Sequence, residues 1–491
     1  MLNRRKLLIG SAAAAAFAGT AVWGTRRLEA KSGLPLPIPP LLDSRKNAQA
    51  LALRVQAGST EFFPGRPSAT MGYNGNYLGP TLRLHRGDDV QVSVTNTLGE
   101  DTTVHWHGLL VPGHLDGGPH QNIRSGQTWR PVLPVRQPAA TLFYHSHVHG
   151  GTAEQVYLGL AGALIIGDDE EAALGLPSEY GVDDLPLVLQ DRQFDQGRLV
   201  IPDGMMTLMR GRRGETLLVN GALAPQARVP AGLVRLRLIN GSNARTWELA
   251  FKDGHAFHWI ASEGGLLAAP VRLTSLSLAP GERAEVVVDF GDGRERTLVT
   301  GPDPNAPMMM MRQFDRLRGN EPLLQIRPQG APRRPAQLPE RLVAQAVPDA
   351  SRAVRRRRFN LDMPMGGMMG GRGMPGGGPG GGAGVFGING RAFEMRRVDE
   401  RIRLGDTEIW EFSGDMMAHP IHVHGVHFQV LRRAGGPPQV RDQGLRDTVM
   451  VGDPVELLVQ FSQPSGDAPF MYHCHILEHE DNGMMGQYAA T

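Results

Sequence analysis

The sequence predicts an all-β protein made of three β-sandwich domains. Glycine (63) and proline (37) together supply a fifth of the 491 residues, and such a composition is typical of many turns between short strands. Residues 90–94 and 234–238 alternate between apolar and polar side chains, which places the apolar set on one face of a sheet. A similar pattern of strands recurs three times, at an interval of about 130 residues that suits a sandwich domain.

Shorter runs complete the predicted sheets. Residues 402–404 alternate again, whereas residues 163–166 and 286–288 are continuous apolar runs next to Gly or Asp. Continuous runs of this length are typical of strands in the core of a sandwich. The turn Pro280-Gly281-Glu282 lies just before residues 286–288 and introduces their strand.

Changes in composition divide the chain into four parts. We expect a signal peptide at residues 1–30 and domains at residues 45–168, 186–328 and 355–491. The seam before the third domain is rich in proline and ends in four consecutive arginines, residues 355–358. In a chain with a net charge of +2, we interpret these arginines as a solvated linker rather than a nucleic-acid site.

The N-terminus has the pattern of an export signal. Arg4-Arg5-Lys6 precedes an apolar, alanine-rich run at residues 7–23. Adjacent arginines indicate the twin-arginine route, although a Sec signal or an uncleaved anchor has a similar pattern. Removing residues 1–30 leaves 46 basic and 48 acidic residues. We therefore expect a nearly neutral mature protein, periplasmic or secreted, with no stable membrane insertion after export.

Cys474 is the single cysteine of the chain. It excludes an intramolecular disulfide, and it excludes zinc ribbons and iron–sulfur centres that need several thiolates. The chemistry must therefore come from other side chains, and the histidines are the first candidates.

Four His-x-His pairs stand out among the 17 histidines. In a strand, residues i and i+2 point to the same side, so each pair can offer two imidazoles to one metal cluster. A single pair of this kind is usually ordinary surface, but four pairs together indicate a metal site. The pairs are His105 and His107, His145 and His147, His422 and His424, and His473 and His475.

Cys474 lies between His473 and His475, and in a strand its side chain points to the opposite side. It can therefore bind one metal ion while its neighbours bind another cluster. Together with His479, Met484 and His419 it completes the Cys, two His and axial Met set of a blue-copper site. The soft thiolate and thioether select copper, and the short peptide from Cys474 to its neighbours is a covalent bridge between the two sites.

The four histidine segments resemble the complete signature of the multicopper oxidases. They are His105-Trp-His107-Gly108, His145-Ser-His147, His419-x-x-His422-x-His424-Gly425 and His473-Cys474-His475-x3-His479-x4-Met484. The resemblance covers essentially the whole mature chain. It implies three cupredoxin-like Greek-key β-sandwich domains and four copper ions. One ion is type 1 copper in the third domain, and a cluster of one type 2 and two type 3 ions lies between the first and third domains.

The resemblance also assigns a role to each ligand. His419, Cys474, His479 and Met484 would bind type 1 copper, and His105 and His422 would bind type 2 copper. His107, His145 and His475 would bind one type 3 copper, and His147, His424 and His473 the other. The second domain contains His255 and His258 without a cysteine partner, and it is expected to be a spacer without metal.

Two carboxylates accompany these ligands. Asp116 follows the first histidine pair, and Glu480 directly follows His479. Reduction of dioxygen to water consumes protons, so acids are needed close to the cluster. The matching positions in bacterial members of the family are proton donors, and we expect Asp116 and Glu480 to be catalytic acids. The alternatives are a turn aspartate before two glycines and a surface glutamate.

Methionines indicate the substrate. The 21 methionines gather at residues 308–311 and in a Gly/Met-rich insert at residues 363–384, which is too rich in Gly and Pro to pack as a core element. Thioethers bind Cu(I), a soft ion. Asp415 and Met417 resemble the substrate-copper position of bacterial copper-efflux oxidases, with Met363 or Met365 as a further ligand of a labile substrate copper.

The sequence thus predicts a periplasmic multicopper oxidase that oxidises Cu(I), and also phenols, while reducing dioxygen to water. Such an enzyme would serve copper tolerance, act as a monomer and bind no nucleic acid. One alternative is a laccase that acts mainly on phenols or on another metal ion. Another is a non-enzymatic envelope or copper-sequestering protein on the same fold. A copper nitrite reductase is disfavoured because it lacks the His-Cys-His bridge.

Overall fold

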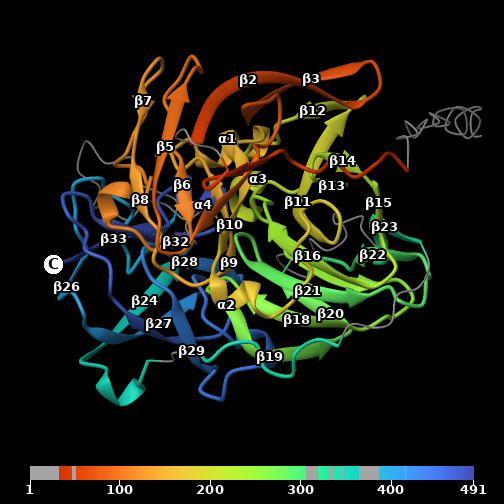
Figure 1. Cartoon of the computed structure of the whole chain (residues 1–491). Coiled ribbons are helices and arrows are strands. Elements are labelled where there is room, and N and C mark those ends of the chain that lie inside the picture. The colour runs from red at the N-terminus through yellow and green to blue at the C-terminus, as the bar shows by residue number, and fades with distance from the viewer. Residues whose placement is uncertain are drawn as a thin grey trace, which may run out of the picture.

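The computed structural model describes residues 33–46, 51–305, 319–330, 337–345, 348–363, 386–414 and 416–491. Strands form six sheets that pack in three pairs along the chain. This arrangement confirms the predicted all-β class and the three cupredoxin-like sandwiches. In Figure 1 the first sandwich (red to orange) lies above the third (blue), and the middle one (green) lies beside both. None of the helices among the described residues is long and apolar enough to span a membrane, and the predicted signal peptide lies outside these residues.

The first sandwich consists of β1 to β10. Their bounds are Leu41–Asp43, Leu51–Phe63, Arg66–Tyr73, Thr81–His85, Asp89–Asn96, His105–His107, Thr128–Trp129, Val132–Pro134, Ala140–His145 and Ala161–Gly167. One sheet has the order β1-β4-β10-β9-β6, and the other has the order β3-β2-β5-β7 with β8 beside β5. Strand β5 alternates as predicted: Val90, Val92 and Val94 are buried, and the polar residues between them are less buried. Trp106, at the centre of β6, is fully buried between the sheets.

The middle sandwich consists of β11 to β23. Their bounds are Asp184–Asp195, Arg198–Val200, Thr216–Val219, Ala222–Leu223, Gln226–Pro230, Leu233–Asn240, Trp247–Phe251, Phe257–Ser262, Gly265–Leu273, Ser275–Leu278, Arg283–Asp289, Arg296–Thr300 and Glu321–Gln329. The larger sheet has the order β14-β13-β11-β16-β21-β18-β19, with β12 beside β11. The smaller sheet has the order β15-β23-β22-β17-β20.

The third sandwich consists of β24 to β33. Their bounds are Arg355–Asp362, Gly387–Ile388, Glu400–Ile402, Thr407–Gly414, His419–Val423, Phe428–Arg433, Thr448–Val451, Val455–Gln460, Phe470–Cys474 and Met485–Ala490. The sheets have the orders β25-β24-β27-β31-β29 and β26-β33-β32-β28-β30. Trp410 is fully buried in their common core.

The helices are short and lie between strands. They are α1 (Thr152–Leu158), α2 (Asp169–Ala172), α3 (Met205–Arg210) and α4 (Leu477–Asp481), together with 3₁₀ turns at Gly113–Leu115, Ala350–Arg352 and Val440–Asp442. The start of α1 in the first domain meets α4 in the third. The Asp481 carboxylate accepts hydrogen bonds from the backbone N–H groups of Thr152 and Ala153, at 3.1 and 2.9 Å. This carboxylate satisfies two amides that the helix leaves unpaired.

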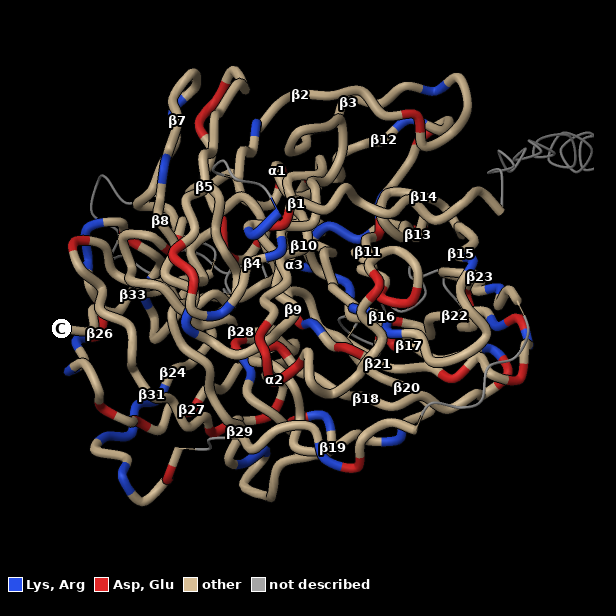
Figure 2. Tube along the Cα trace, viewed as in Figure 1, with Lys and Arg blue, Asp and Glu red and all other residues tan. Residues whose placement is uncertain are grey.

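The arginine run at residues 355–358 is part of a strand, so the linker interpretation is wrong. These residues open β24, which pairs with β27. Arg356 contacts Glu456 at 2.9 Å, and Arg357 contacts Glu408 at 2.6 Å. Arginines can occupy this strand because acidic side chains on β27 and β31 face them. Figure 2 shows Lys and Arg interspersed with Asp and Glu along the described part of the chain.

The alternating strand β16 places Val234, Leu236 and Leu238 in one core, as predicted, and its polar face is buried as well. The pattern predicts one apolar and one polar face, but both faces are buried because Arg235 and Arg237 lie against the first domain. Arg237 binds Asp184 at 2.6 Å and Glu285 at 3.0 Å. Burial opposes the charge of Arg237, but these carboxylates hold its pKa above the ordinary value. The polar face therefore builds a domain border instead of facing water.

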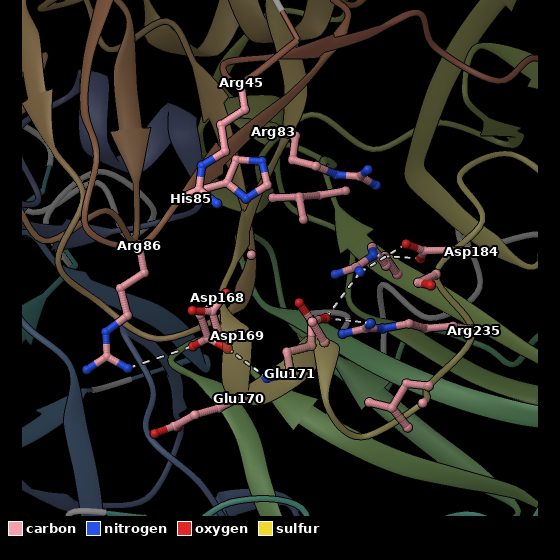
Figure 3. A pocket seen from close by; sticks show the side chains of 17 residues that line it. Arg45, Arg83, His85, Arg86, Asp168, Asp169, Glu170, Glu171, Asp184 and Arg235 are labelled. Atoms are coloured by element: carbon pink, nitrogen blue, oxygen red, sulfur yellow. Dashed lines mark hydrogen bonds and ion pairs between the residues drawn. The ribbon is translucent and has the colours of Figure 1, made fainter.

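The same border encloses a cavity of about 600 Å³. Figure 3 shows Arg45, His85 and Arg86 on one side of it and Arg235 on the other, with the acidic start of α2 between them. The ion pair between Arg235 and Glu171, 2.6 Å long, crosses the border. Most charges lining the cavity are thus paired within the protein.

Candidate metal centre

The eight histidines of the predicted pairs meet at the border between the first and third domains. Strands β6 and β9 pair side by side, with His105 opposite His145. Strands β28 and β32 pair in the third domain, with His422 opposite His473. Each sheet therefore presents neighbouring rings on adjacent strands, and the rings of the two domains face one another. All eight side chains are buried.

Ring nitrogens of these histidines approach one another at distances that suit a shared metal ion. Two ligand nitrogens about 2 Å from one ion lie about 3.3 Å apart when the angle at the ion is tetrahedral. The observed separations are 3.4 Å for His105 Nε2 and His422 Nε2, 3.3 Å for His107 Nδ1 and His145 Nε2, 3.2 Å for His147 Nε2 and His473 Nε2, and 3.1 Å for His424 Nε2 and His473 Nε2.

His475 gives an independent indication that metal fits here. Both of its ring nitrogens are buried without a hydrogen-bond partner, and its ring lies 5.0 Å from that of His107 and 5.5 Å from that of His145, between centroids. A buried polar atom without a partner is costly, and a metal ion would supply the missing one. A cluster of neutral imidazoles suits copper among the transition metals.

Burial also keeps the rings unprotonated. Loss of solvation lowers the pKa of His422 to about 3 and that of His419 to about 4. The pKa values of His107, His145, His147 and His424 are also lowered, chiefly by burial. Neutral rings keep a lone pair free for a metal ion at ordinary pH.

Asp116 and Glu480 lie directly behind the cluster. His424 Nδ1 lies 2.7 Å from Asp116 Oδ2, and His105 Nδ1 lies 3.4 Å from the same oxygen. Glu480 contacts Nδ1 of His147 and Nδ1 of His473, both at 3.2 Å. Both carboxylates are buried, so neither is a surface residue. Their contacts orient the rings so that Nε2 points into the cluster.

Asp447 is a third carboxylate at the cluster, and the sequence reasoning did not find it. Its Oδ1 lies 3.1 Å from His107 Nε2 and 2.8 Å from Thr448 Oγ1, and its backbone oxygen accepts from His422 Nδ1 at 2.9 Å. Burial alone would raise the pKa of Asp447, but Arg283 and His107 hold it well below the ordinary value. The one local signal is a charged pair, Arg446-Asp447, before a buried strand.

The second predicted site forms on the other side of β32. Cys474 Sγ lies 3.5 Å from His419 Nδ1 and 3.7 Å from His479 Nδ1, and the two nitrogens are 3.2 Å apart. Cys474 and Met484 are fully buried, and Cys474 N–H donates to the Met484 carbonyl at 3.0 Å. Burial raises the pKa of the Cys474 thiol, so a thiolate here requires a cation beside it. The donor set fits copper.

The middle domain contacts this second site through α3. Leu208 and Met209 pack against the core of the third domain, and the Met209 carbonyl lies 3.4 Å from His479 Nε2. Among the described residues, His255 and His258 join no group of metal-ligating side chains. His255 instead lies 3.1 Å from the Asp289 carbonyl.

The predicted substrate-copper residues are only partly described. Met363 is buried at the end of β24, and Met417 packs against the same core. Met416 is 43% exposed with φ of 68°. Asp415, Met365 and the methionine run at residues 308–311 lie outside the described residues.

Three segments match family models, each described as multicopper oxidase, at residues 54–171, 188–297 and 359–491. The chain belongs to the multicopper oxidase family. The three matched segments lie in the three sandwiches, and the first and third of these segments carry the histidine clusters. The family implies dioxygen and a reducing substrate as reactants.

Curated relatives carry the name cell division protein FtsP. The FtsP of Pectobacterium atrosepticum is 40% identical over 99% of this chain and 98% of the relative, and that of Yersinia pestis is 41% identical over 92% and 91%. Solved structures include a laccase-like multicopper oxidase, CueO, from Ochrobactrum sp., with 39% identity, a TM-score of 0.83 and coverage of 93% of this chain and all of that one. A metallo-oxidase from Campylobacter jejuni has 28% identity, a TM-score of 0.79 and coverage of 94% and 95%.

The geometry around Cys474 leads to a prediction for the variant Cys474→Ser. If this donor set holds copper, the copper-loaded variant should lose the intense blue absorption and any oxidase activity together, because the thiolate would be the ligand responsible for the colour. Folding should change little, since no disulfide is lost. Absorption spectra, copper content and thermal unfolding of the purified protein measure these effects. The matched control is His258→Ala, which should keep all three properties, and full activity of Cys474→Ser would contradict the assignment.

Proposed function

We propose that this protein is an exported oxidase that transfers electrons from Cu(I), and also from phenols, to dioxygen. The observation that carries the proposal is the pair of buried donor sets joined through Cys474. A site with only one of these sets could bind copper, but it could not pass electrons from a substrate to a separate site for dioxygen.

Each ligand has an assigned role in this proposal. Type 1 copper would be held by His419, Cys474, His479 and Met484, and type 2 copper by His105 and His422. The type 3 ions would be held by His107, His145 and His475, and by His147, His424 and His473. The bound copper would supply one-electron oxidation at the first site and four-electron reduction of dioxygen at the cluster.

The peptide around Cys474 connects the two sites. His473 and Cys474 lie on opposite faces of β32, and His475 follows directly. The path from Sγ to either ring runs through covalent bonds of neighbouring residues. The backbone of Cys474 is itself fixed by the hydrogen bond to Met484, which keeps the bridge rigid.

Asp116 and Glu480 are the proposed proton donors. The net reaction oxidises four Cu(I) ions and combines one dioxygen with four protons to give two water molecules. Asp116 Oδ1 is buried without a hydrogen-bond partner, and Oδ2 contacts the rings of His105 and His424, so this carboxylate lies next to the cluster. Glu480 lies on the opposite side, between His147 and His473. Protons can thus reach the cluster from two sides.

The preference for Cu(I) rests on the methionines near the type 1 site. Met417 packs on the core that contains Cys474, and Met363 lies at the edge from which the Gly/Met-rich insert departs. We propose that Asp415, Met417 and either Met363 or Met365 hold a labile substrate copper. The name metallo-oxidase of the Campylobacter relative supports this choice, while the laccase-like Ochrobactrum relative supports phenol oxidation as the alternative.

The relatives named cell division protein FtsP favour a second candidate function, a role at the division site that needs no oxidase chemistry. Copper binding separates the two proposals. An oxidase should bind four copper ions per chain and be blue, whereas a division protein without oxidase activity need not bind any. We also propose export by the twin-arginine route to the periplasm, on the basis of Arg4 and Arg5.

The function is tested by loading the purified protein with copper and measuring its spectrum, copper content and dioxygen uptake. We expect four copper ions, a blue band, and dioxygen uptake of one molecule per four Cu(I) ions oxidised. A colourless protein with no dioxygen uptake would support the division role. Faster turnover of phenols than of Cu(I) at equal concentrations would support the laccase alternative.

Replacing Asp116 with asparagine tests the proton supply. The variant keeps the shape of the side chain but cannot donate a proton, so turnover should fall more than tenfold, which corresponds to about 1.4 kcal/mol in the barrier. The blue band should remain, because Asp116 does not contact the Cys474 site. An unchanged rate of dioxygen reduction would show that Asp116 does not supply protons and has only a structural role. Asp88→Asn, a half-exposed carboxylate of the same domain, is the matched control.

The insert can be tested by replacing residues 364–385 with a short turn. Asp362 pairs with Gly387 across β24 and β25, so the two ends lie side by side and two or three residues can join them. Met363 is retained because it is buried in the core. Cu(I) oxidation at low copper should fall several-fold, since the thioethers that gather Cu(I) are gone, while phenol oxidation should stay equal or rise.

A full-length variant separates the thioethers from the length of the insert. Four of its five methionines, Met365, Met368, Met369 and Met374, are replaced by serine, while the buried Met363 is kept. Cu(I) oxidation should fall as in the shortened protein, while phenol oxidation should match the wild type. A parallel fall of both activities in both variants would mean that the insert only stabilises the fold.

A further inference from the structure

The middle domain reaches the trinuclear centre, although it supplies none of the metal-ligand groups found among the described residues. The contact is made by the turn before β21 and the first residue of that strand, residues 279–283, which we call the β21 turn. The β21 turn contains Pro280-Gly281-Glu282 and ends at Arg283, the first residue of β21. All of these residues are buried, so the turn lies inside the protein rather than at its surface.

Arg283 is the first contact between the β21 turn and the centre. Its Nη1 and Nη2 donate to Asp447 Oδ1 and Oδ2 at 2.7 and 2.5 Å. Asp447 in turn contacts His107 Nε2, and its backbone oxygen accepts a hydrogen bond from His422 Nδ1. A bidentate pair of this kind fixes the plane of the carboxylate as well as its position. The orientation of two proposed copper ligands from different domains therefore depends on an arginine from the middle domain.

The surroundings of Arg283 hold it in place. Nη1 also donates to the Gly281 carbonyl at 3.0 Å, and Nε donates to the Thr141 carbonyl of the first domain at 3.3 Å. Its guanidinium carbon lies 5.8 Å from the centre of the Phe143 ring. Arg283 is fully enclosed, so no water replaces these partners when one of them is removed. The three domains meet at this one side chain.

Gly281 is the second contact. It has φ of 81°, a conformation that favours glycine, and a Cβ at this position would lie 2.8 Å from Cδ2 of His475. The backbone of the β21 turn thus forms the wall against which the His475 ring packs. Close approach of backbone to ring requires the absence of a side chain. Both nitrogens of His475 are unpartnered, so packing rather than hydrogen bonding fixes this ring.

A further ion pair fastens the same turn to the third domain. Arg446, next to Asp447 in the chain, contacts Glu282 at 3.2 Å and Glu263 at 2.9 Å. Arg446 and Arg283 therefore cross the border in opposite directions, each toward a carboxylate of the other domain. Crossed pairs of this kind permit one docked position and oppose sliding of one domain along the other.

We propose that Arg283 is a positioning residue of the trinuclear centre, and that copper occupancy of the centre therefore depends on docking of the middle domain. The inference rests on the proposed function, since it assumes that the histidine cluster binds copper. It replaces the expectation that the middle domain is only a spacer. Arg283 contacts no metal-ligating nitrogen itself; it acts through Asp447, and Gly281 acts on His475 in the same turn.

The test compares Arg283→Met with Arg237→Met in the full-length, copper-loaded protein. Both arginines are buried, come from neighbouring strands of one sheet and pair with carboxylates. The carboxylate paired with Arg283 contacts His107, whereas Asp184 and Glu285, the carboxylates paired with Arg237, bind arginines and Thr141. Copper per chain, the type 2 signal in electron paramagnetic resonance and the blue band are measured for each. The wild type is measured in parallel, because absence of copper there would refute the proposed function rather than this inference.

Arg283→Met should keep the blue band and its one copper ion but lose most of the other three, with the type 2 signal weakened at least several-fold. Arg237→Met should keep all four ions, even where its thermal unfolding temperature falls as far. Four ions and an unchanged type 2 signal in Arg283→Met would overturn the inference. Equal loss of copper from both variants would also overturn it, because general destabilisation would then explain the loss.

Arg283→Lys covers the case in which Arg283→Met does not fold. Lysine keeps the positive charge beside Asp447 but cannot form the bidentate pair. If Arg283 positions the ligands, the type 2 signal of Arg283→Lys should change its shape while the blue band and the unfolding temperature stay close to those of the wild type. An unchanged signal in this variant would show that only charge is required, and the positioning role would be refuted.

Discussion

The structure depends on one constraint: imidazoles from two domains must lie within metal-binding distance of one another in a dry interior. Burying a neutral imidazole ring costs little free energy only if both of its nitrogens have partners. One nitrogen of each ring faces the cluster, so the protein must satisfy the other. Asp116, Glu480 and the Asp447 segment supply most of these second partners. The carboxylates behind the rings are therefore as much a part of the site as the rings themselves.

The same constraint explains why the domain borders are polar and rigid. A shift of about 1 Å between the first and third domains would bring the paired nitrogens to the limit of about 4 Å that one ion can span with metal–nitrogen distances of about 2 Å. Asp481 ties the start of α1 to α4. Arg237 ties the middle domain to Thr141 of the first domain, and Arg283 ties it to Asp447 of the third. Burying so many ion pairs contributes little net stability. Their contribution is a unique docking geometry, which the metal-binding distances require.

The sequence predicted the features that depend on local periodicity. Strand geometry alone placed both members of each His-x-His pair on one side and Cys474 on the other, and the structure has this arrangement. Prediction from the sequence failed where a partner far away in the chain determines the environment of a residue. Arg235 and Arg237 alternate like solvent-facing residues, yet a neighbouring domain covers them. The ion pair between Arg283 and Asp447 joins residues 164 positions apart, and no local pattern in the sequence indicates such a contact.

The pairing of Asp362 with Gly387 has a consequence for how such proteins diversify. The insert leaves and re-enters the fold at one point of a two-stranded ladder, so its length is not coupled to the rest of the sandwich. Each doubling of the length of a loop costs only about 0.6 kcal/mol of closure entropy. A change in the length or composition of this segment therefore costs the sandwich little, and a new binding segment can enter the chain at this point without altering the two sheets.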